Sequence, residues 1–413
     1  MNRATFMTVI VGITLLLDWY VFQAVRIVTS DLSSTARKLI HIFYWSITAF
    51  SVLGILAYNL LDISQLKSLR SVILVFIFGN FIAKLFGALF LFLDDIIRLV
   101  TGLFAKASNT SGGDQGFSQS RSDFLAKTAL IATATPAAIM SFGIISGAYD
   151  YRVRRKVITL PNLPKAFDGI RIGQLSDIHS GSFFDKIAVR GGVEMLLAEK
   201  PDLICFTGDL VNNKSEEVKD YVDIFNKLKA PLGVYSTLGN HDYGDYSSWS
   251  SDQAKKKNLQ DLITTQKQMG WDILLNENRF IETSGEKIAL LGIENWGAGR
   301  FQKYGDLEKT YAGSEEAPFK ILLSHDPSHW DAQVRPNHAD IDLMLAGHTH
   351  GMQFGVEIGD FRWSPSKWIY KQWADLYQEG NQYLYVNRGF GFIGYPGRVG
   401  ILPEIAIIEL KSA

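Results

Sequence analysis

Four long apolar stretches in the first 150 residues place the strongest constraint on the fold of this chain. They run from about 5 to 28, 39 to 61, 69 to 93 and 124 to 147, each close to the ~20 residues that cross a bilayer as a helix. The first stretch is too long for the apolar core of a typical signal peptide and has no clear small-x-small cleavage site. We therefore predict a transmembrane region of four helices over residues 1–150, which would anchor the chain in the cell (inner) membrane.

Three charged residues in or near these stretches stand out, because charge inside a membrane is costly and often functional. They are Asp18, Lys84 and Asp94. The alternative is structural: Lys84 extends toward the interface, and the aspartates lie near interfaces or pair within the bundle. We favour the structural interpretation.

The net charge and the cysteine content exclude one class of partner and one kind of covalent link. The 413 residues carry a formal net charge of −1, whereas a nucleic-acid-binding chain usually presents a basic face, so no nucleic-acid partner is expected. The single cysteine, Cys205, lies in the apolar run DLICF, which excludes an intramolecular disulfide and predicts a core thiol. Neither feature specifies an oligomeric state.

From about Val157 the pattern becomes that of a soluble domain. The apolar runs IRIGQLS, DLICFTG and LGVYSTLG alternate with helix-like stretches at about 186–200 and 214–229. Strands predominate further on: a hairpin around Ser284 and Gly285 is followed by KILLS, IDLMLAG, QYLYV and EIAIIEL. We predict a second domain over residues 157–413, in which helices cover β-sheets.

Four other segments have distinctive compositions. Residues 107–123, rich in Ser, Gly and Gln, predict a flexible loop between the third and fourth spans. The basic run YRVRRK at 151–156 either fixes membrane topology or holds anionic headgroups. The polar segment 244–257 is either a loop at the rim of a site or a disordered insertion. The aromatic segment Phe361 to Trp373 lies either at a membrane interface or in the core.

Five polar clusters, each directly after a predicted strand, indicate the chemistry of the second domain. They are LSDIHSG, FTGDL, LGNHD, LLSHD and LAGHTH, and they supply Asp177, His179, Asp209, Asn240, His241, His325, His348 and His350. In open α/β sheets the loops after the strands converge on one site. In D-x-H and H-x-H both side chains point to the same face of an extended chain. These oxygen and imidazole ligands suit two divalent metals and predict a hydrolytic metal centre.

The remaining histidines have no such setting. His41, His329 and His338 are predicted to be ordinary interfacial or surface residues. A strand followed by Gly208 and Asp209 could, taken alone, be a turn or a helix cap, so the prediction rests on the full set of clusters.

The order D-x-H, G-D, G-N-H-D, a lone His after a strand and G-H-x-H resembles the signature of the calcineurin-like metallophosphoesterase superfamily over about residues 157–413. The segments LAGHTHGMQFG and NRGFGFIGYPGRVGILPEIAIIEL look most like its bacterial membrane-associated or exported branch, typified by the YkuE and YaeI phosphoesterases. The resemblance implies an α/β fold, a four-layer αββα metallophosphoesterase sandwich, here preceded by an all-α transmembrane region. That region lies outside the superfamily motif.

The resemblance also implies roles for individual residues. Asp177, His179 and His350 would hold one metal, Asn240, His325 and His348 the second, and Asp209 would bridge them. His241 would act on the substrate phosphate or the leaving oxygen, and Asp242 would orient it. Two divalent ions, Mn, Fe or Zn, are implied.

The chemistry of such a centre predicts hydrolysis. Two cations neutralise phosphate oxygens and lower the pKa of a bridging water, so that hydroxide can attack phosphorus at neutral pH. We predict a membrane-anchored phosphoesterase that hydrolyses a phosphate ester or pyrophosphate bond. The substrate would be a phosphate-containing small molecule or lipid, for example a lipid-linked or nucleotide-linked phosphate. The alternative is a membrane receptor or transport subunit whose metal-containing domain binds a phosphate ligand without turnover.

Orientation in the membrane follows from the basic residues near the span ends. Four spans place the amino terminus, the 62–68 loop and the second domain on one side. Lys and Arg are equally numerous on both sides, and leaving out Arg26, Arg98 and Lys127 at uncertain helix edges favours a cytoplasmic second domain.

Overall fold

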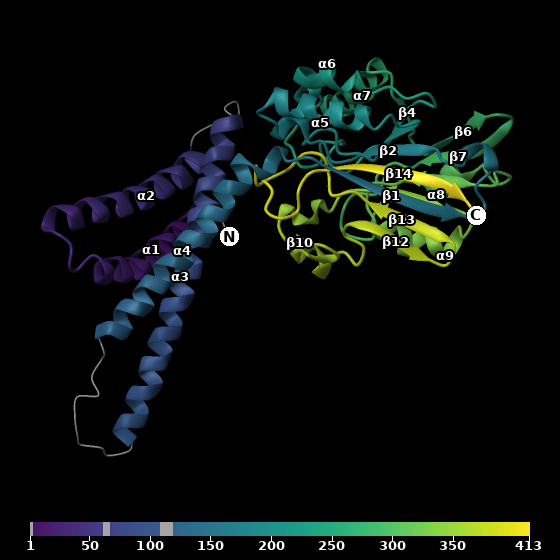
Figure 1. Cartoon of the computed structure of the whole chain (residues 1–413). Coiled ribbons are helices and arrows are strands. Elements are labelled where there is room, and N and C mark those ends of the chain that lie inside the picture. Colours follow the sequence, from purple (N-terminus) through teal and green to yellow (C-terminus); the bar gives the residue numbers. More distant parts are fainter. Residues whose placement is uncertain (1–2, 61–66, 108–118) are drawn as a thin grey trace. The chain divides into compact units, whose positions relative to one another are not determined.

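A computed structural model describes residues 3–60, 67–107 and 119–413 (Figure 1). The chain divides into two compact units, Met1–Phe142 and Gly143–Ala413. Residues 61–66, which include most of the predicted 62–68 loop, lie outside the described residues, as do residues 108–118 of the predicted 107–123 loop.

The first unit consists of long helices: α1 (Arg3–Val28), α2 (Ser34–Leu60), α3 (Lys67–Ala107) and α4 (Gln119–Ile145, whose last residues belong to the second unit). Each contains or overlaps a segment long and apolar enough to cross a membrane: Met7–Val28, Ser34–Ala57, Val75–Val100 and Phe124–Tyr149. This confirms the prediction of a membrane protein. Helix α3 extends well beyond residue 93, and residues 119–123 of the predicted loop belong to α4.

Asp18, Lys84 and Asp94, the charged residues singled out in the predicted spans, each form an ion pair within this unit. Lys84 Nζ lies 2.6 Å from Asp18 Oδ1, and both side chains are buried. Arg98 Nη2 lies 2.6 Å from Asp94 Oδ2, one turn away on α3. Pairing inside the bundle is thus the arrangement found. The expectation that Lys84 extends toward the interface is wrong, because its side chain is buried against Asp18.

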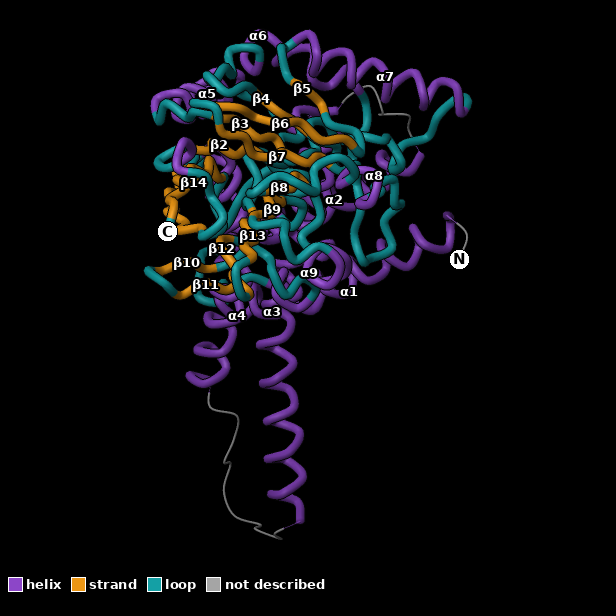
Figure 2. Tube along the Cα trace, turned by 90° about the vertical axis from the view of Figure 1, so that its right-hand side faces the viewer, coloured by secondary structure: helices purple, strands orange, loops and turns teal. Residues whose placement is uncertain are grey.

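Two six-stranded sheets form the frame of the second unit (Figure 2). The first has the order β1 (Arg152–Leu160), β14 (Glu404–Ser412), β2 (Arg171–Leu175), β3 (Leu203–Phe206), β4 (Val234–Ser236), β5 (Asp272–Ile273). The second has the order β12 (Asp375–Glu379), β13 (Gln382–Val386), β9 (Leu343–Ala346), β8 (Lys320–Leu323), β7 (Glu286–Gly292), β6 (Glu277–Thr283). A separate pair, β10 (Val356–Ile358) and β11 (Phe361–Trp363), forms a small hairpin.

The layers follow from where the apolar side chains lie. One core, with Leu203, Cys205, Ile321 and Leu343 among its members, joins residues of the two sheets. Other cores join the first sheet to α5 (Lys186–Ala198), α6 (Val222–Phe225) and α7 (Asp252–Gln268), and the second sheet to α8 (Leu307–Tyr311) and the helical turn Trp330–Val334, which runs into α9 (Arg335–Asn337). Together these layers are the predicted αββα sandwich.

Central strands are buried on both faces, which explains their continuous apolar sequences. All four residues of β3, LICF, are buried, as are all four of β8 and of β9. Helix α5 begins where Asp185 accepts hydrogen bonds from the amides of Ile187 and Ala188, an N-cap that satisfies otherwise free donors. The remaining helical turns are Gly147–Tyr149, Lys165–Phe167, Ser180–Ser182, Ser215–Tyr221, His350–Gln353 and Pro365–Trp368.

Three segments differ from their predicted form. The basic run 151–156 lies largely in β1, and its charges are paired: Arg155 with Glu199, 2.5 Å apart, and Lys156 with Asp375, 2.8 Å apart. Residues 252–257 of the polar segment form the first turns of α7. The helical stretch expected at 214–229 is the turn Ser215–Tyr221 followed by the short α6.

Candidate metal centre

The five polar clusters lie at the ends of five strands, as their sequence positions predict. Asp177 and His179 follow β2, Asp209 follows β3, and Asn240 follows β4, all in the first sheet. His325 follows β8, and His348 and His350 follow β9, both in the second sheet. Both sheets therefore contribute side chains to one buried site.

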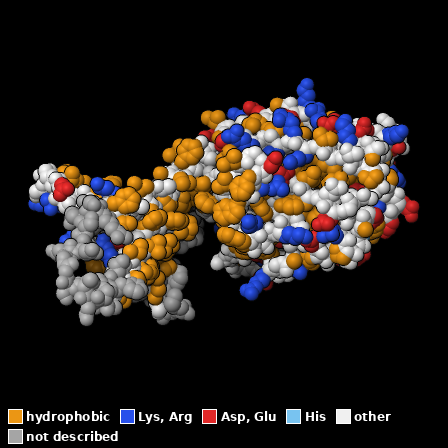
Figure 3. Space-filling model, turned by 60° about the horizontal axis from the view of Figure 1, so that its bottom comes forward, with side chains coloured by type: hydrophobic (Ala, Val, Ile, Leu, Met, Phe, Trp, Pro, Cys, Tyr) orange, Lys and Arg blue, Asp and Glu red, His pale blue; other side chains and the backbone are white. Residues whose placement is uncertain are grey.

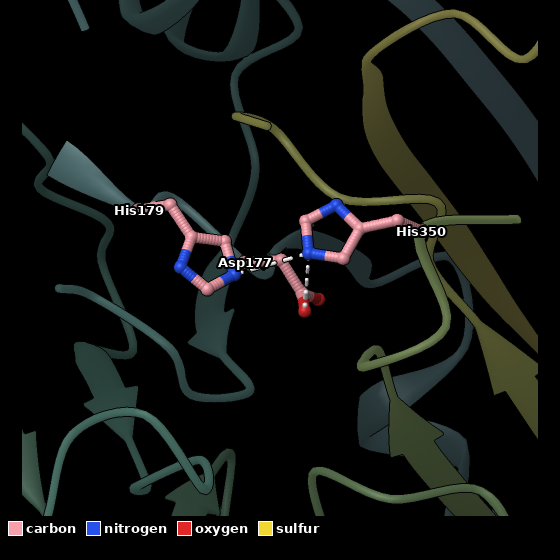
Figure 4. Close-up of side chains that lie close together, drawn as sticks. All are labelled: Asp177, His179 and His350. Atoms are coloured by element: carbon pink, nitrogen blue, oxygen red, sulfur yellow. Dashed lines mark hydrogen bonds and ion pairs between the residues drawn. The ribbon is translucent and has the colours of Figure 1, made fainter. Parts of the chain in front are cut away.

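A first group consists of Asp177, His179 and His350 (Figure 4). The Nε2 atoms of His179 and His350 face each other at 3.0 Å, and His350 Nε2 lies 3.2 Å from Asp177 Oδ1. All three side chains are buried. Converging imidazole and carboxylate atoms of this kind are a donor set suited to a divalent cation such as Zn²⁺ or Mn²⁺.

A second group consists of Asp209, His325 and His348. His325 Nε2 lies 3.1 Å from Asp209 Oδ2 and 3.3 Å from His348 Nδ1. The same Oδ2 atom of Asp209 lies 3.5 Å from His179 Nε2 in the first group. One carboxylate thus stands between the two groups.

Asn240 contributes a polar atom that the protein does not satisfy. Its Oδ1 is buried and has no hydrogen-bond partner among the described residues, while its Nδ2 donates to the Tyr246 hydroxyl at 3.0 Å. A buried amide oxygen without a partner is costly, so it calls for a ligand such as a cation. The residues present therefore fit a metal.

Further hydrogen bonds orient the imidazoles. His325 Nδ1 lies 2.7 Å from the Thr207 carbonyl, which favours a proton on Nδ1 and turns Nε2 toward Asp209. His348 Nε2 lies 2.7 Å from the Tyr370 hydroxyl, and its Nδ1 faces the second group. Tyr370 and the buried Arg398, which contacts His350, belong to the site, but no motif or spacing in the sequence predicts them.

The backbone at the site is unusual. Asp177, His179, Asp209, His348 and His350 all have positive φ, between 48° and 70°. Residues other than glycine rarely adopt this backbone conformation, and those that do are concentrated at functional sites. The glycines of G-N-H-D and G-H-T-H are needed for space, because a Cβ at position 239 would lie 2.7 Å from the Asp209 carboxyl carbon.

His241 is half-buried, and its ring is fixed. Its Nδ1 lies 2.8 Å from the Asn212 carbonyl, and its backbone N–H donates to Asp209 Oδ1 at 2.8 Å. Its ring lies 5.0 Å from that of His179, centroid to centroid. His241 thus borders the first group without joining either group.

The side chain of Asp242 is hydrogen-bonded to the backbone of two neighbouring loops. Its carboxylate accepts four backbone N–H groups, from Asp209, Leu210, Val211 and Gly239, at 2.8–3.2 Å. The His241 ring bonds to the Asn212 carbonyl, and the role of Asp242 in orienting His241 stays a prediction. Asp242 holds the loop that carries Asp209. Burial, and then the charge of Asp209, raise the pKa of Asp242 to about 7 against these four donors.

The electrostatics of the protein alone hold most of the candidate ligands, but not His325, in the protonation state that binds cations. Burial would raise the pKa of Asp209, but the neighbouring histidines, first His325, hold it well below its usual range. Burial lowers the pKa of His179 well below its ordinary value and also lowers that of His350. Burial lowers the pKa of His325, but the negative charges of Asp209 and Asp177 outweigh this effect and raise the pKa to about 10. Ionised carboxylates and neutral imidazoles are the forms that bind metals, so a cation at the second group must displace the proton that this raised pKa places on His325.

Two of the other histidines are not surface residues, contrary to the prediction. His329 is fully buried, with Nδ1 2.9 Å from the Ser324 hydroxyl and Nε2 3.1 Å from Gln333 Oε1. His338 is also buried, and its Nε2 lies 3.0 Å from Glu308 Oε1. Both bond to protein groups outside the candidate metal centre. His41 is half-buried on α2.

Comparison with known proteins agrees with this site. Residues 170–352 match the family model of the calcineurin-like phosphoesterases, and residues 2–148 match the model described as a probable calcineurin-like phosphoesterase transmembrane domain. One model thus matches the first unit, and the other matches residues 170–352 of the second.

Individual relatives bear related names. The metallophosphoesterase YkuE of Bacillus subtilis is 32% identical over 254 residues, which cover 60% of this chain and 82% of the relative. A transmembrane protein with metallophosphoesterase domain from Danio rerio is 31% identical, over 69% of this chain and 62% of that protein, less than two thirds of its length. A metallophosphoesterase of Aquifex aeolicus is 25% identical, over 66% of this chain and 99% of that one. The chain belongs to the calcineurin-like phosphoesterase family and is a membrane-associated, metal-dependent hydrolase of phosphoric esters.

Proposed function

We propose that this enzyme is a dinuclear-metal phosphoesterase that hydrolyses phosphate ester or pyrophosphate bonds. The observation that carries the proposal is the position of Asp209, whose Oδ2 lies 3.1 Å from His325 Nε2 and 3.5 Å from His179 Nε2. A single carboxylate between two groups of imidazoles is the arrangement that holds two cations close together.

The proposed ligand sets follow the two groups. Asp177, His179 and His350 hold one ion, and Asn240, His325 and His348 hold the other, with Asp209 shared. The free Oδ1 of Asn240 supports its place in the second set. Mn, Fe and Zn all suit these ligands. When bound, such ions neutralise phosphate oxygens and make water a nucleophile at neutral pH.

His241 is proposed to act on the substrate. Its ring borders the first group and is half-exposed, so a phosphate bound at the centre could reach it. The Asn212 carbonyl holds Nδ1, so Nε2 is the ring nitrogen proposed to give a proton to the leaving oxygen. A positioned general acid of this kind contributes roughly 10² to 10⁴ in rate.

The substrate class and the side of the membrane complete the proposal. The substrate carries a phosphate on a small molecule or a lipid, and the catalytic unit faces the cytoplasm. The orientation rests on the distribution of basic residues near the spans, and the association with the membrane on the four helices.

The test uses the full chain in detergent, loaded with Mn²⁺. Generic phosphomonoesters, phosphodiesters and nucleotide pyrophosphates are assayed with the unchanged protein, with Asp209→Asn and with Asp220→Asn. Asp220 is the matched control, because its side chain is 80% exposed on the surface. We expect turnover of at least one substrate class by the unchanged protein and the control, and loss of both turnover and bound metal in Asp209→Asn. Absence of hydrolysis in every case would sink the proposal.

A further inference from the structure

The β10–β11 hairpin has its apolar face turned outward. Directly paired residues of antiparallel strands lie on the same face, and the register pairs Val356 with Trp363 and Ile358 with Phe361. Ile358 is 73% exposed and Phe361 62% exposed, and Val356 is exposed as well. We call these four residues the apolar hairpin face.

The opposite face of the hairpin is charged and turned inward. It carries the pair Glu357 and Arg362. Glu357 Oε1 accepts a hydrogen bond of 2.7 Å from the fully buried Arg388, and Glu357 also pairs with Arg154. Arg362 Nη1 lies 2.5 Å from Asp375 Oδ2. A soluble surface hairpin normally has the reverse polarity, so the outward apolar face indicates an apolar environment.

The next turn extends this surface. Trp368 and Ile369 are 70% and 66% exposed, and the Trp368 ring packs edge-on against that of Trp363, with centroids 5.7 Å apart. Lys367 and Lys371 flank them, and both are exposed. Figure 3 shows hydrophobic side chains, in orange, reaching the surface of the second unit among charged ones. Among the three tryptophans of the segment from Phe361 to Trp373, for which the sequence left interface and core open, Trp373 is buried, at 5% exposed.

Two hydrogen bonds attach this surface to the candidate metal centre. The buried hydroxyl of Ser364, directly after β11, donates to the Gly351 carbonyl at 2.6 Å, next to His350. The hydroxyl of Tyr370, directly after Ile369, lies 2.7 Å from His348 Nε2. The exposed apolar residues are therefore next in sequence to Ser364 and Tyr370, which contact the segment that carries the candidate ligands His348 and His350.

We propose that the apolar hairpin face together with Trp368 and Ile369 rests in the headgroup region of the bilayer, and that the enzyme takes its phosphate ester from a membrane lipid. The proposal rests on the proposed function for its second half only. Tryptophans flanked by lysines are the composition of protein surfaces at membrane interfaces, where the ring is partly buried and the ammonium reaches lipid phosphates.

A bilayer fits this surface better than a soluble partner. The same chain carries four helices able to cross a membrane, so the catalytic unit is never far from lipid. The hairpin and the following turn are short, and the lysines at the edge match anionic headgroups in charge. A second copy of the chain is the other possible occupant, and the experiment below distinguishes it.

The location test places an environment-sensitive fluorophore at Ile369→Cys in the full chain, reconstituted in vesicles of phosphatidylcholine and phosphatidylglycerol that contain nitroxide-labelled acyl chains. The native thiol does not interfere, because Cys205 is the only cysteine and is fully buried. Phe280→Cys on β6, 40% exposed in the native residue, is the matched control. We expect quenching by at least a factor of two at position 369 and none at position 280. Equal quenching at both, or crosslinking of position 369 between two copies, would overturn the proposal.

The substrate test compares phosphatidic acid in those vesicles with p-nitrophenyl phosphate in solution. The double variant Trp368→Glu and Ile369→Glu should lose at least tenfold in turnover of the lipid and stay within twofold on the soluble ester. Equal loss on both, or no loss on the lipid, contradicts the lipid-substrate half. If the unchanged protein hydrolyses neither of these monoesters, the lipid-substrate half fails; the assays of phosphodiesters and nucleotide pyrophosphates then decide the proposed function, and quenching at position 369 decides the membrane contact separately.

Discussion

Arg398 Nη2 lies 3.1 Å from His350 Nδ1, so a fully buried guanidinium stands directly behind one candidate metal ligand. The same nitrogen donates to the carbonyls of Arg388 and Gly391 at 2.7 and 2.6 Å. The Arg398 amide donates to the Gly143 carbonyl at 3.1 Å, at the end of α4. Burial lowers the pKa of this guanidinium to about 10, so it stays charged at neutral pH. Arg398 ties the segment after β13 and the end of α4 to the ligand loop.

Replacing Arg398 with Met should therefore destabilise the catalytic unit and loosen its metal. The variant leaves several buried carbonyls without donors, each worth about 1–3 kcal/mol, so a total loss of roughly 3 kcal/mol or more is expected. Thermal unfolding and metal content of the full chain are the measurements. Arg300→Met, at an exposed site, should behave like the unchanged protein. Normal metal content and melting in Arg398→Met would show that the buried guanidinium is dispensable.

Asp242→Asn tests the role that the hydrogen bonds give this carboxylate. Each carboxylate oxygen accepts two of the four N–H groups, so an amide leaves two of these donors facing an NH₂ group without an acceptor. We expect a loss of about 2–4 kcal/mol in stability, together with weaker metal binding, because the loop that carries Asp209 is freed. Asp220→Asn is again the control. If only turnover fell, with stability and metal unchanged, Asp242 would instead act through His241.

Strand ends made the candidate ligands predictable, whereas the residues that support them were not. A polar residue directly after an apolar run marks the carboxyl end of a strand, and this local signal located Asp177, Asp209 and His325 together. No local signal links Arg398 to His350 or Asp242 to the loop after β3, because those contacts depend on how distant segments fold back. The outward apolar face of the β10–β11 hairpin was equally hidden, since strand alternation shows two faces but not which one points inward.

The buried His329 should make the catalytic unit sensitive to acid. Burial lowers its pKa to about 4, whereas the unfolded chain has the ordinary value of about 6.5. As the pH falls, the unfolded state binds the proton before the folded state does. The contribution of neutral, buried His329 to the free energy of unfolding is therefore complete above about pH 6.5. It is lost as the pH falls toward 4, for a total of roughly 3 kcal/mol. His329→Asn removes the group.

The measurement is the melting temperature of both proteins between pH 7 and pH 5. The unchanged protein should lose more stability over this range than His329→Asn, by about 2 kcal/mol. Comparing how steeply the melting temperatures of the two proteins fall with pH removes the contribution of every other titrating group. Equal slopes would contradict a depressed pKa at His329.

Metal removal should lower the melting temperature of the catalytic unit. Ligands that bind only the folded state stabilise it by about 2.7 kcal/mol for each site when their concentration is 100 times the dissociation constant. EDTA should therefore lower the transition by several degrees, and added Mn²⁺ should restore it. Asp209→Asn should show a smaller response, since its side chain lies between both groups. A melting temperature of the metal-loaded protein that EDTA does not change would argue against ions held by these residues.

His241→Ala separates metal binding from proton transfer. His241 lies outside both groups of candidate ligands, so metal content and melting temperature should stay close to those of the unchanged protein. Turnover should fall by roughly 10² to 10⁴, the usual contribution of a general acid. The loss must also depend on the leaving group. A p-nitrophenolate needs little protonation, so its ester should be affected least, while esters of poorly acidic alcohols should be affected most. An equal loss for all leaving groups would assign His241 to charge stabilisation, and a parallel loss of metal would make it a ligand.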